Sequence, residues 1–383
     1  MKNRILVLAL ALVCFTGAGM AQVKSLKSAK RFLQQEKYSD AVALIEKVVV
    51  DPETADMLDA WVTRGKIYLA ISRNPLMLRD FPTAADMSKE SFEKAFQIDP
   101  SNKNILLLRN DINGLANVFY DNGARKYEER NFAVAAEEFE KSFQVSMIEG
   151  VYDTNCAFNI ALCASNAGIL DKAIEYYKAL VDGGAMLSGA YIGLADAYFR
   201  NDQKEEASAV IENAVNLFPE DRNIYINASS VYLRMGANEK ASELLNTALE
   251  KWSDDAPFQL FIGIAYENDG KYDEAEAAYL KALELNPDYA EAIYNTGAFY
   301  VNQGIRLKDE ANALPLEEET KYAELEAAAK DVFNKAIPYL QKVLEAQPQN
   351  VNVMMTLRDV YMQLGQAAAA QEWGEKVKEL QGE

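Results

Sequence analysis

One small residue recurs along this chain at a regular spacing, and this spacing constrains the fold more than any other feature. Steps of 34 residues separate Ala173, Ala207, Ala241 and Ala275. Each of these alanines is followed four positions later by a large apolar or aromatic residue, which lies on the same face of a helix. Repetition at a period of roughly 20 to 50 residues is typical of solenoids, in which each repeat buries its apolar side against its neighbours.

The same small position continues toward both ends of the chain, with longer steps in two regions. The full series is Ala41, Ser88, Ala135, Ala173, Ala207, Ala241, Ala275, Ala336 and Ala370. It predicts about nine helix–turn–helix units. The longer steps predict insertions near residues 69–87 and 305–331, and Pro338 is expected to kink or restart the helix that follows the second insertion. Because no linker rich in Pro, Gly or Ser divides the chain, residues 22–383 are predicted to form a single array.

The seventh unit shows the pattern most completely, with Gly263, Tyr266, Gly270, Tyr272, Ala275, Tyr279, Ala282 and Pro287 at fixed offsets. This arrangement resembles the tetratricopeptide repeat, a helix–turn–helix unit of 34 residues. Gly263 and Ala275 allow the two helices to approach closely, and Tyr279 fills the space between them. Gly270 suits the left-handed conformation that ends the first helix, and Pro287 ends the second.

The resemblance implies the fold class and the kind of function. It implies an all-α protein in which about nine units form a right-handed α–α superhelix, the tetratricopeptide-repeat solenoid. It also implies a concave groove lined by the first helix of each unit. Proteins of this family use the groove to bind another protein or an extended peptide, so we expect such a partner here.

The first 21 residues have the layout of a secretory signal. Lys2 and Arg4 form a basic start, an apolar run follows, and small residues precede a cleavage site after Ala21. The apolar run is too short to span a bilayer, which needs roughly 20 residues. We therefore predict export, most simply to the periplasm and otherwise to the exterior or the outer cell surface, with no membrane insertion after cleavage.

The charge of the chain argues against two classes of partner. Without Lys2 and Arg4, 37 Lys and Arg residues face 58 Asp and Glu residues, for a net charge of −21. Such a surface repels phosphate backbones and anionic lipids, so neither nucleic-acid binding nor attachment to an anionic membrane is expected.

The residues available offer little catalytic chemistry. The chain has no histidine, which excludes Ser-His-Asp and Cys-His nucleophile systems and the histidine zinc motifs. Cys156 and Cys163 lie seven positions apart, about 10.5 Å along a helix, which is too far for a disulfide. We therefore predict that the protein is not an enzyme and has no cofactor, metal site or catalytic residue.

The predicted first helices carry a repeated pair of positions that suits a peptide. At steps of 34 residues the first position of the pair is large and apolar, and in alternate units the second is asparagine. An asparagine amide both donates to and accepts from a peptide bond, as in the asparagine ladders of some peptide-binding tetratricopeptide arrays. The candidate groove residues are Phe158, Asn159, Ile192, Ile226, Asn227, Leu260, Tyr294 and Asn295.

Three interpretations follow from the sequence. The leading hypothesis is a non-catalytic scaffold or chaperone-like adaptor that binds a protein or peptide in the groove. An alternative is a solute- or glycan-capturing component of an envelope uptake system. For the groove residues themselves, the competing interpretation is structural: the apolar members pack between neighbouring helices, and the asparagines face water.

Overall fold

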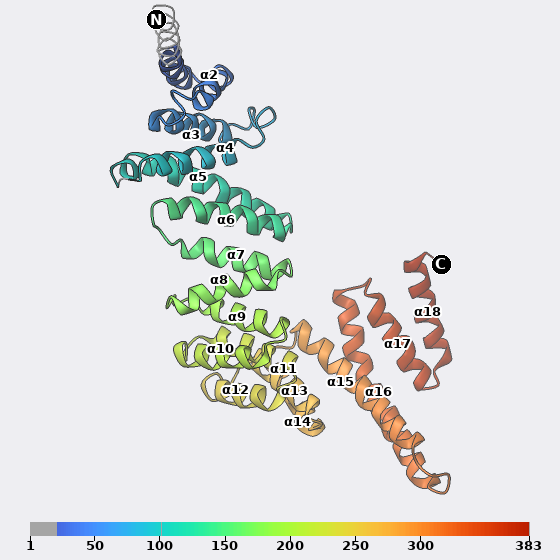
Figure 1. The fold of residues 1–383 in the computed structure, drawn as a ribbon. Coiled ribbons are helices and arrows are strands. Elements are labelled where there is room, and N and C mark those ends of the chain that lie inside the picture. The colour runs from blue at the N-terminus through green and yellow to red at the C-terminus, as the bar shows by residue number, and fades with distance from the viewer. Residues whose placement is uncertain (1–20, 101, 383) are drawn as a thin grey trace, which may run out of the picture. The chain divides into compact units, whose positions relative to one another are not determined.

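The chain folds entirely into α-helices wherever its structure is described (Figure 1). The computed structural model describes residues 21–100 and 102–382. The predicted signal segment, residues 1–21, lies outside the described residues except for Ala21. Among the helices that are described, none has the combination of length and apolar character that a membrane span requires.

The chain divides into two compact units, and each is described by itself. Unit 1 ends at Gln203. Its first described segment, residues 21–34, is helical. The helices that follow in unit 1 are α2 (Tyr38–Val50), α3 (Leu58–Ser72), α4 (Ala84–Ile98), α5 (Asn102–Glu128), α6 (Phe132–Ile148), α7 (Thr154–Asn166), α8 (Leu170–Asp182) and α9 (Ser188–Arg200).

Unit 2 comprises residues 204–383. Its helices are α10 (Lys204–Leu217), α11 (Arg222–Met235), α12 (Asn238–Lys251), α13 (Ala256–Asn268), α14 (Tyr272–Leu285), α15 (Ala290–Asn312), α16 (Glu319–Ala346), α17 (Val351–Gln363) and α18 (Ala367–Gln381).

Consecutive helices pack as hairpins within each unit. In unit 1 the helix over residues 21–34 packs on α2, and α3 packs on α4, α5 on α6, and α7 on α8. In unit 2 the hairpins are α11–α12, α13–α14, α15–α16 and α17–α18. Together with the consecutive helices α9 and α10, these hairpins account for nine units. The all-α class and the repeated helix–turn–helix unit are confirmed.

The periodic small residues lie where the two helices of a hairpin meet. All nine are buried, and eight of them have no exposed surface. The large residue four positions later is buried as well, from Ile45 in α2 to Leu340 in α16. Where serine replaces alanine, the hydroxyl finds a partner, because Ser88 Oγ donates to the Gly65 carbonyl at 2.9 Å. The periodicity therefore marks the core of each hairpin.

A glycine on the first helix faces the large residue on the second. A Cβ built on Gly263 would lie 2.8 Å from the Tyr279 ring, and one built on Gly193 would overlap the Tyr177 ring. The turn chemistry is also as expected. Gly270 has a φ of +73°, and α14 ends at Leu285, two residues before Pro287.

Lysines tie neighbouring repeats together through matching contacts. Lys251 Nζ donates to the Pro219 carbonyl at 2.7 Å, and Lys342 Nζ donates to the Pro287 carbonyl at 2.6 Å. In both cases the carbonyl belongs to the proline that follows the second helix of the preceding hairpin. Such exposed ion contacts stabilise a fold only slightly, but they set the spacing between successive hairpins.

The two insertions take different forms. The extra residues near 69–87 include the irregular segment 73–83 between α3 and α4. The insertion at 305–331 lengthens both α15 and α16, which are joined through residues 313–318. Pro338 does not restart a helix as expected, because α16 continues through it. Proline removes a single backbone hydrogen bond, and the adjacent turn is held by Ala336 and Leu340, which are buried in the hydrophobic core that α15 and α16 share.

The contact between Gly263 and Tyr279 generates a testable prediction. We expect Gly263→Ala to lower the free energy of unfolding, because the added methyl overlaps the Tyr279 ring and overpacking costs about 1–3 kcal/mol. Better helix propensity offsets about 1 kcal/mol of this loss. Denaturation followed by circular dichroism measures the effect.

Gly374→Ala is the matched control. Its Cβ would lie 3.7 Å from Arg358 Cδ, an ordinary contact, so its stability is expected to stay unchanged or to rise. If both variants gained stability equally, the close approach at Gly263 would not be a packing constraint.

Candidate partner-binding site

The candidate groove residues of unit 1 lie on α7 and α9. Phe158 is half-buried, and its ring packs edge-on against Tyr177 with the centroids 5.8 Å apart. Asn159 Nδ2 donates to the Tyr120 hydroxyl at 3.1 Å. Ile192 is half-buried. Each of these side chains keeps some exposed surface, while Phe158 and Asn159 also make contacts within the unit.

The candidates of unit 2 differ widely in exposure. Leu260 has no exposed surface and belongs to the hydrophobic core, so it cannot contact a partner in this conformation. Ile226 is half-buried against another core cluster. Tyr294 is 49% exposed. Leu260 is therefore removed from the set of surface residues, because its helix turns this position toward the neighbouring hairpin.

The unit 2 asparagines bond back to their own helices. Asn227 Nδ2 donates to the Asn223 carbonyl at 2.8 Å, and Asn295 Nδ2 donates to the Glu291 carbonyl at 2.7 Å. These local contacts use part of the hydrogen-bonding capacity that a peptide ladder needs. The structure thus gives Asn227 and Asn295 a local role on α11 and α15.

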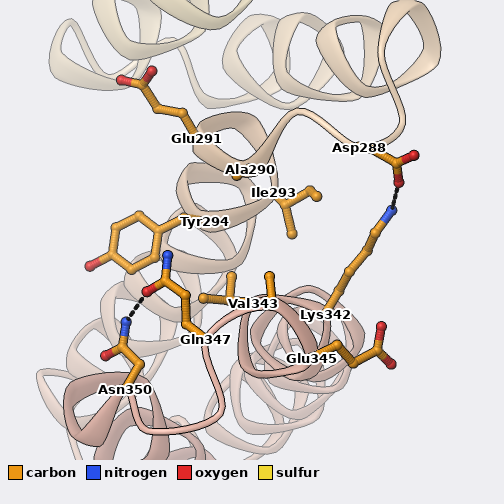
Figure 2. Close-up of a pocket in the computed structure, with 11 residues that line it drawn as sticks. Asp288, Ala290, Glu291, Ile293, Tyr294, Lys342, Val343, Glu345, Gln347 and Asn350 are labelled. Carbon is orange, nitrogen blue, oxygen red and sulfur yellow. Dashed lines mark hydrogen bonds and ion pairs between the residues drawn. The ribbon is translucent and has the colours of Figure 1, made fainter.

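A pocket of about 390 Å³ opens beside Tyr294 in unit 2 (Figure 2). The start of α15, the end of α16 and the turn that leads into α17 form its walls. The lining residues are Asp288, Ala290, Glu291, Ile293, Tyr294, Lys342, Val343, Glu345, Ala346, Gln347 and Asn350. Its volume lies within the range of about 300–1,000 Å³ that is usual for ligand sites.

The pocket has an apolar interior and a polar rim. Ile293 and Val343 are nearly buried beneath it, and the half-exposed ring of Tyr294 forms one side. On the rim, Asn350 Nδ2 donates to Gln347 Oε1 at 2.8 Å, and this contact orients the Gln347 amide (Figure 2). An apolar interior with a few oriented polar groups is the usual composition of a binding site.

Local sequence positions these walls. Pro287 follows the end of α14, so the chain turns through Asp288 before α15 begins at Ala290. Asn350 caps α17 by accepting a hydrogen bond from Val353 N at 3.2 Å. The first helices α11 and α13 pack on each other, whereas α15 and α17 make no comparable contact within the described chain. This separation leaves space for the pocket.

The periodic pattern identified only Tyr294 among the pocket's main groups. Val343 and Gln347 come from the end of a second helix and from a turn, which the 34-residue pattern of first helices does not sample. Asn350 has a readable signal, since asparagine directly before an apolar helical run is a common helix cap. Nothing in the spacing indicates that these residues meet.

One Ser–Lys contact in unit 2 resembles a nucleophile with its base. Lys240 Nζ lies 2.6 Å from Ser208 Oγ and 3.0 Å from Glu212 Oε1. The hydrogen bond to Glu212 raises the pKa of Lys240, so its ammonium has no lone pair with which to accept the Ser208 proton. The contact therefore does not activate the serine.

The cysteines and carboxylates also have ordinary structural roles. Cys156 and Cys163 are free and buried, as expected. Burial raises the pKa of Cys156 to about 12 and that of Cys163 to about 11, which keeps both as unreactive thiols. Within the described residues, no group of three or more potential ligands is placed to hold a metal ion.

Comparison with known families identifies the repeat. Two models described as tetratricopeptide repeat match residues 192–256 and 327–380, and one described as TPR repeat matches residues 269–304. The chain belongs to the tetratricopeptide-repeat family. Such repeats imply a protein-interaction scaffold, and proteins of this family are generally non-catalytic. No curated protein sequence matches the chain.

Solved structures with similar folds include three repeat proteins. The MamA protein is 25% identical, with a TM-score of 0.38 over 46% of this chain and 94% of its own. A thermophilic TPR protein from Thermus thermophilus is 24% identical, with a TM-score of 0.36 over 46% of this chain and 94% of its own. A tetratricopeptide repeat protein from Parabacteroides merdae is 13% identical, with a TM-score of 0.46 over 69% and 93% of the two chains. With TM-scores below 0.5, these likenesses carry no conclusion about function.

The protonation of Lys240 generates a prediction about reactivity. We expect a fluorophosphonate probe to leave Ser208 unlabelled near neutral pH, because no base accepts the hydroxyl proton. Mass spectrometry of the probed protein tests this, with Ser208→Ala as the background control and an active serine hydrolase as the positive control. A stable adduct on Ser208 would contradict the proposed protonation state.

Proposed function

We propose that this protein is a non-catalytic adaptor that binds a segment of another protein through the pocket beside Tyr294. The observation that carries the proposal is the half-exposed tyrosine over an apolar interior, next to an amide that is already oriented. Large aromatic side chains at the centre of a pocket are typical of residues that contribute most to binding.

The pocket's geometry favours a side chain of a protein over a folded surface. It accepts a protruding apolar group, while the Gln347 amide stands on the rim where the backbone of the bound segment would pass. Asn350 holds this amide in place, so little side-chain freedom is lost on binding.

The cellular location is part of the proposal. The basic start, short apolar run and small residues before Gln22 support export to the periplasm, or to the exterior or outer surface. An exported adaptor would meet its partner outside the cytoplasm. A chaperone-like role, in which the pocket holds a partner before assembly, is compatible with the same site.

Solute or glycan capture is the competing function. Glycan sites need several polar groups around the sugar hydroxyls, whereas the interior of this pocket is formed by Ile293, Tyr294 and Val343. The composition of the interior therefore favours an apolar side chain.

A photo-crosslinking experiment tests the proposed function. We expect a photoreactive phenylalanine analogue at position 294 to capture a discrete protein in the native cell envelope. The captured protein, once purified, is expected to bind Tyr294→Ala at least about tenfold more weakly than the unsubstituted chain, because the aromatic wall of the pocket is lost. Binding is measured by calorimetry.

Tyr322 supplies the control for this experiment. It is 43% exposed, close to the exposure of Tyr294, but it lies on α16 and does not line the pocket. We expect Tyr322→Ala to leave the affinity unchanged. Equal affinities of Tyr294→Ala and the unsubstituted chain would remove the pocket from the binding site, and stabilisation by sugars without any protein capture would favour the uptake function.

A further inference from the structure

The two units carry very different charges. Residues 1–203 contain 23 Lys and Arg against 26 Asp and Glu, a net charge of −3. Residues 204–383 contain 16 Lys and Arg against 32 Asp and Glu, a net charge of −16. Unit 2, which holds the pocket, therefore carries most of the negative charge of the chain.

The rim of the pocket repeats this excess at short range. Asp288, Glu291 and Glu345 line it, and Lys342 is its only cationic lining residue. Lys342 is already paired, since its Nζ lies 3.1 Å from Asp288 Oδ1. The carboxylates of Glu291 and Glu345 have no salt-bridge partner within the described chain. A positively charged ligand thus meets two carboxylates and no competing free cation.

We propose that the pocket binds a large apolar side chain, such as leucine or phenylalanine, that is flanked by lysine or arginine in an extended segment of a partner protein. This inference rests on the proposed function and specifies the chemistry of the partner. The apolar side chain enters between Tyr294, Ile293 and Val343, and the basic flanks pass over Glu291 and Glu345.

The apolar and charged parts of the site have different tasks. Burial of the apolar side chain supplies most of the affinity, because the interior of the pocket excludes water. The carboxylates attract a basic segment and repel an acidic one, so they mainly set specificity and the rate of association. The net charge of unit 2 extends this attraction beyond the rim, and added salt screens it over about 10 Å at 0.1 M.

Four synthetic peptides test the inference. The first has a central leucine with lysines on both sides, the second replaces the lysines by glutamates, the third replaces them by serines, and the fourth keeps the lysines but replaces the leucine by glycine. Fluorescence anisotropy with the full chain measures their affinities at low and at moderate salt. We expect the lysine–leucine peptide to bind most tightly, the serine peptide more weakly, and the other two weakest.

Variants of the chain assign the effects to the pocket. We expect Glu291→Gln combined with Glu345→Gln to weaken binding of the lysine–leucine peptide roughly three- to tenfold and to reduce its salt dependence. Glu250→Gln is the matched control, since Glu250 is an exposed carboxylate on α12 away from the pocket, and it is expected to have a smaller effect. Ala346→Trp, which fills the pocket from its rim, is expected to abolish binding of the same peptide.

The outcomes distinguish this inference from the proposed function. Equal binding of the lysine-, glutamate- and serine-flanked peptides would overturn the inferred charge preference but leave an apolar peptide site intact. Binding of the lysine peptides that ignores the central residue and Ala346→Trp would show attraction to the acidic surface alone, which also overturns the inference. Self-association through the pocket, detected by sedimentation and blocked by Ala346→Trp, would overturn it too, by assigning the site to a second copy of this chain.

Discussion

The close approach of the two helices in each hairpin is the constraint on which the rest of the structure depends. It needs a small residue on one helix and room for a large residue from the other, as at Gly263 and Tyr279. Since neither helix buries its apolar face alone, every hairpin must also pack against its neighbours. The 34-residue period is the sequence record of this requirement, and a larger residue at the small position disrupts one hairpin and the contacts on both of its sides.

The candidate binding site arises where this regular packing is interrupted. The hairpin α15–α16 is lengthened by its insertion, and its first helix does not pack closely on α17. The space between them retains apolar walls that would otherwise be buried in contact with a neighbouring helix. Ile293 and Val343 are core residues by composition, yet they form the interior of an open pocket. A binding site of this kind needs no special residues, because it uses core residues that lack a neighbour.

The candidate groove and the observed pocket illustrate what periodicity reads well and what it misses. Aligned first helices correctly singled out Tyr294 as a position with exposed surface. The same alignment included Leu260, which stands at the equivalent position but is fully buried. Equivalent positions in successive repeats share a helix face, but the exposure of that face depends on how closely the next hairpin packs. The spacing also did not indicate that Asn227 and Asn295 bond to their own helices.

The sequence by itself determined the all-helical repeat, the buried small residues, the ends of the helices at Gly270 and Pro287, and the position of both insertions. These features depend on contacts within one hairpin, whose residues lie within a single period of the sequence. Only the tertiary structure decided which exposed positions form a site. Tyr294, Val343 and Gln347 meet because of the spacing between hairpins, and this spacing is the sum of many side-chain contacts that no single motif records.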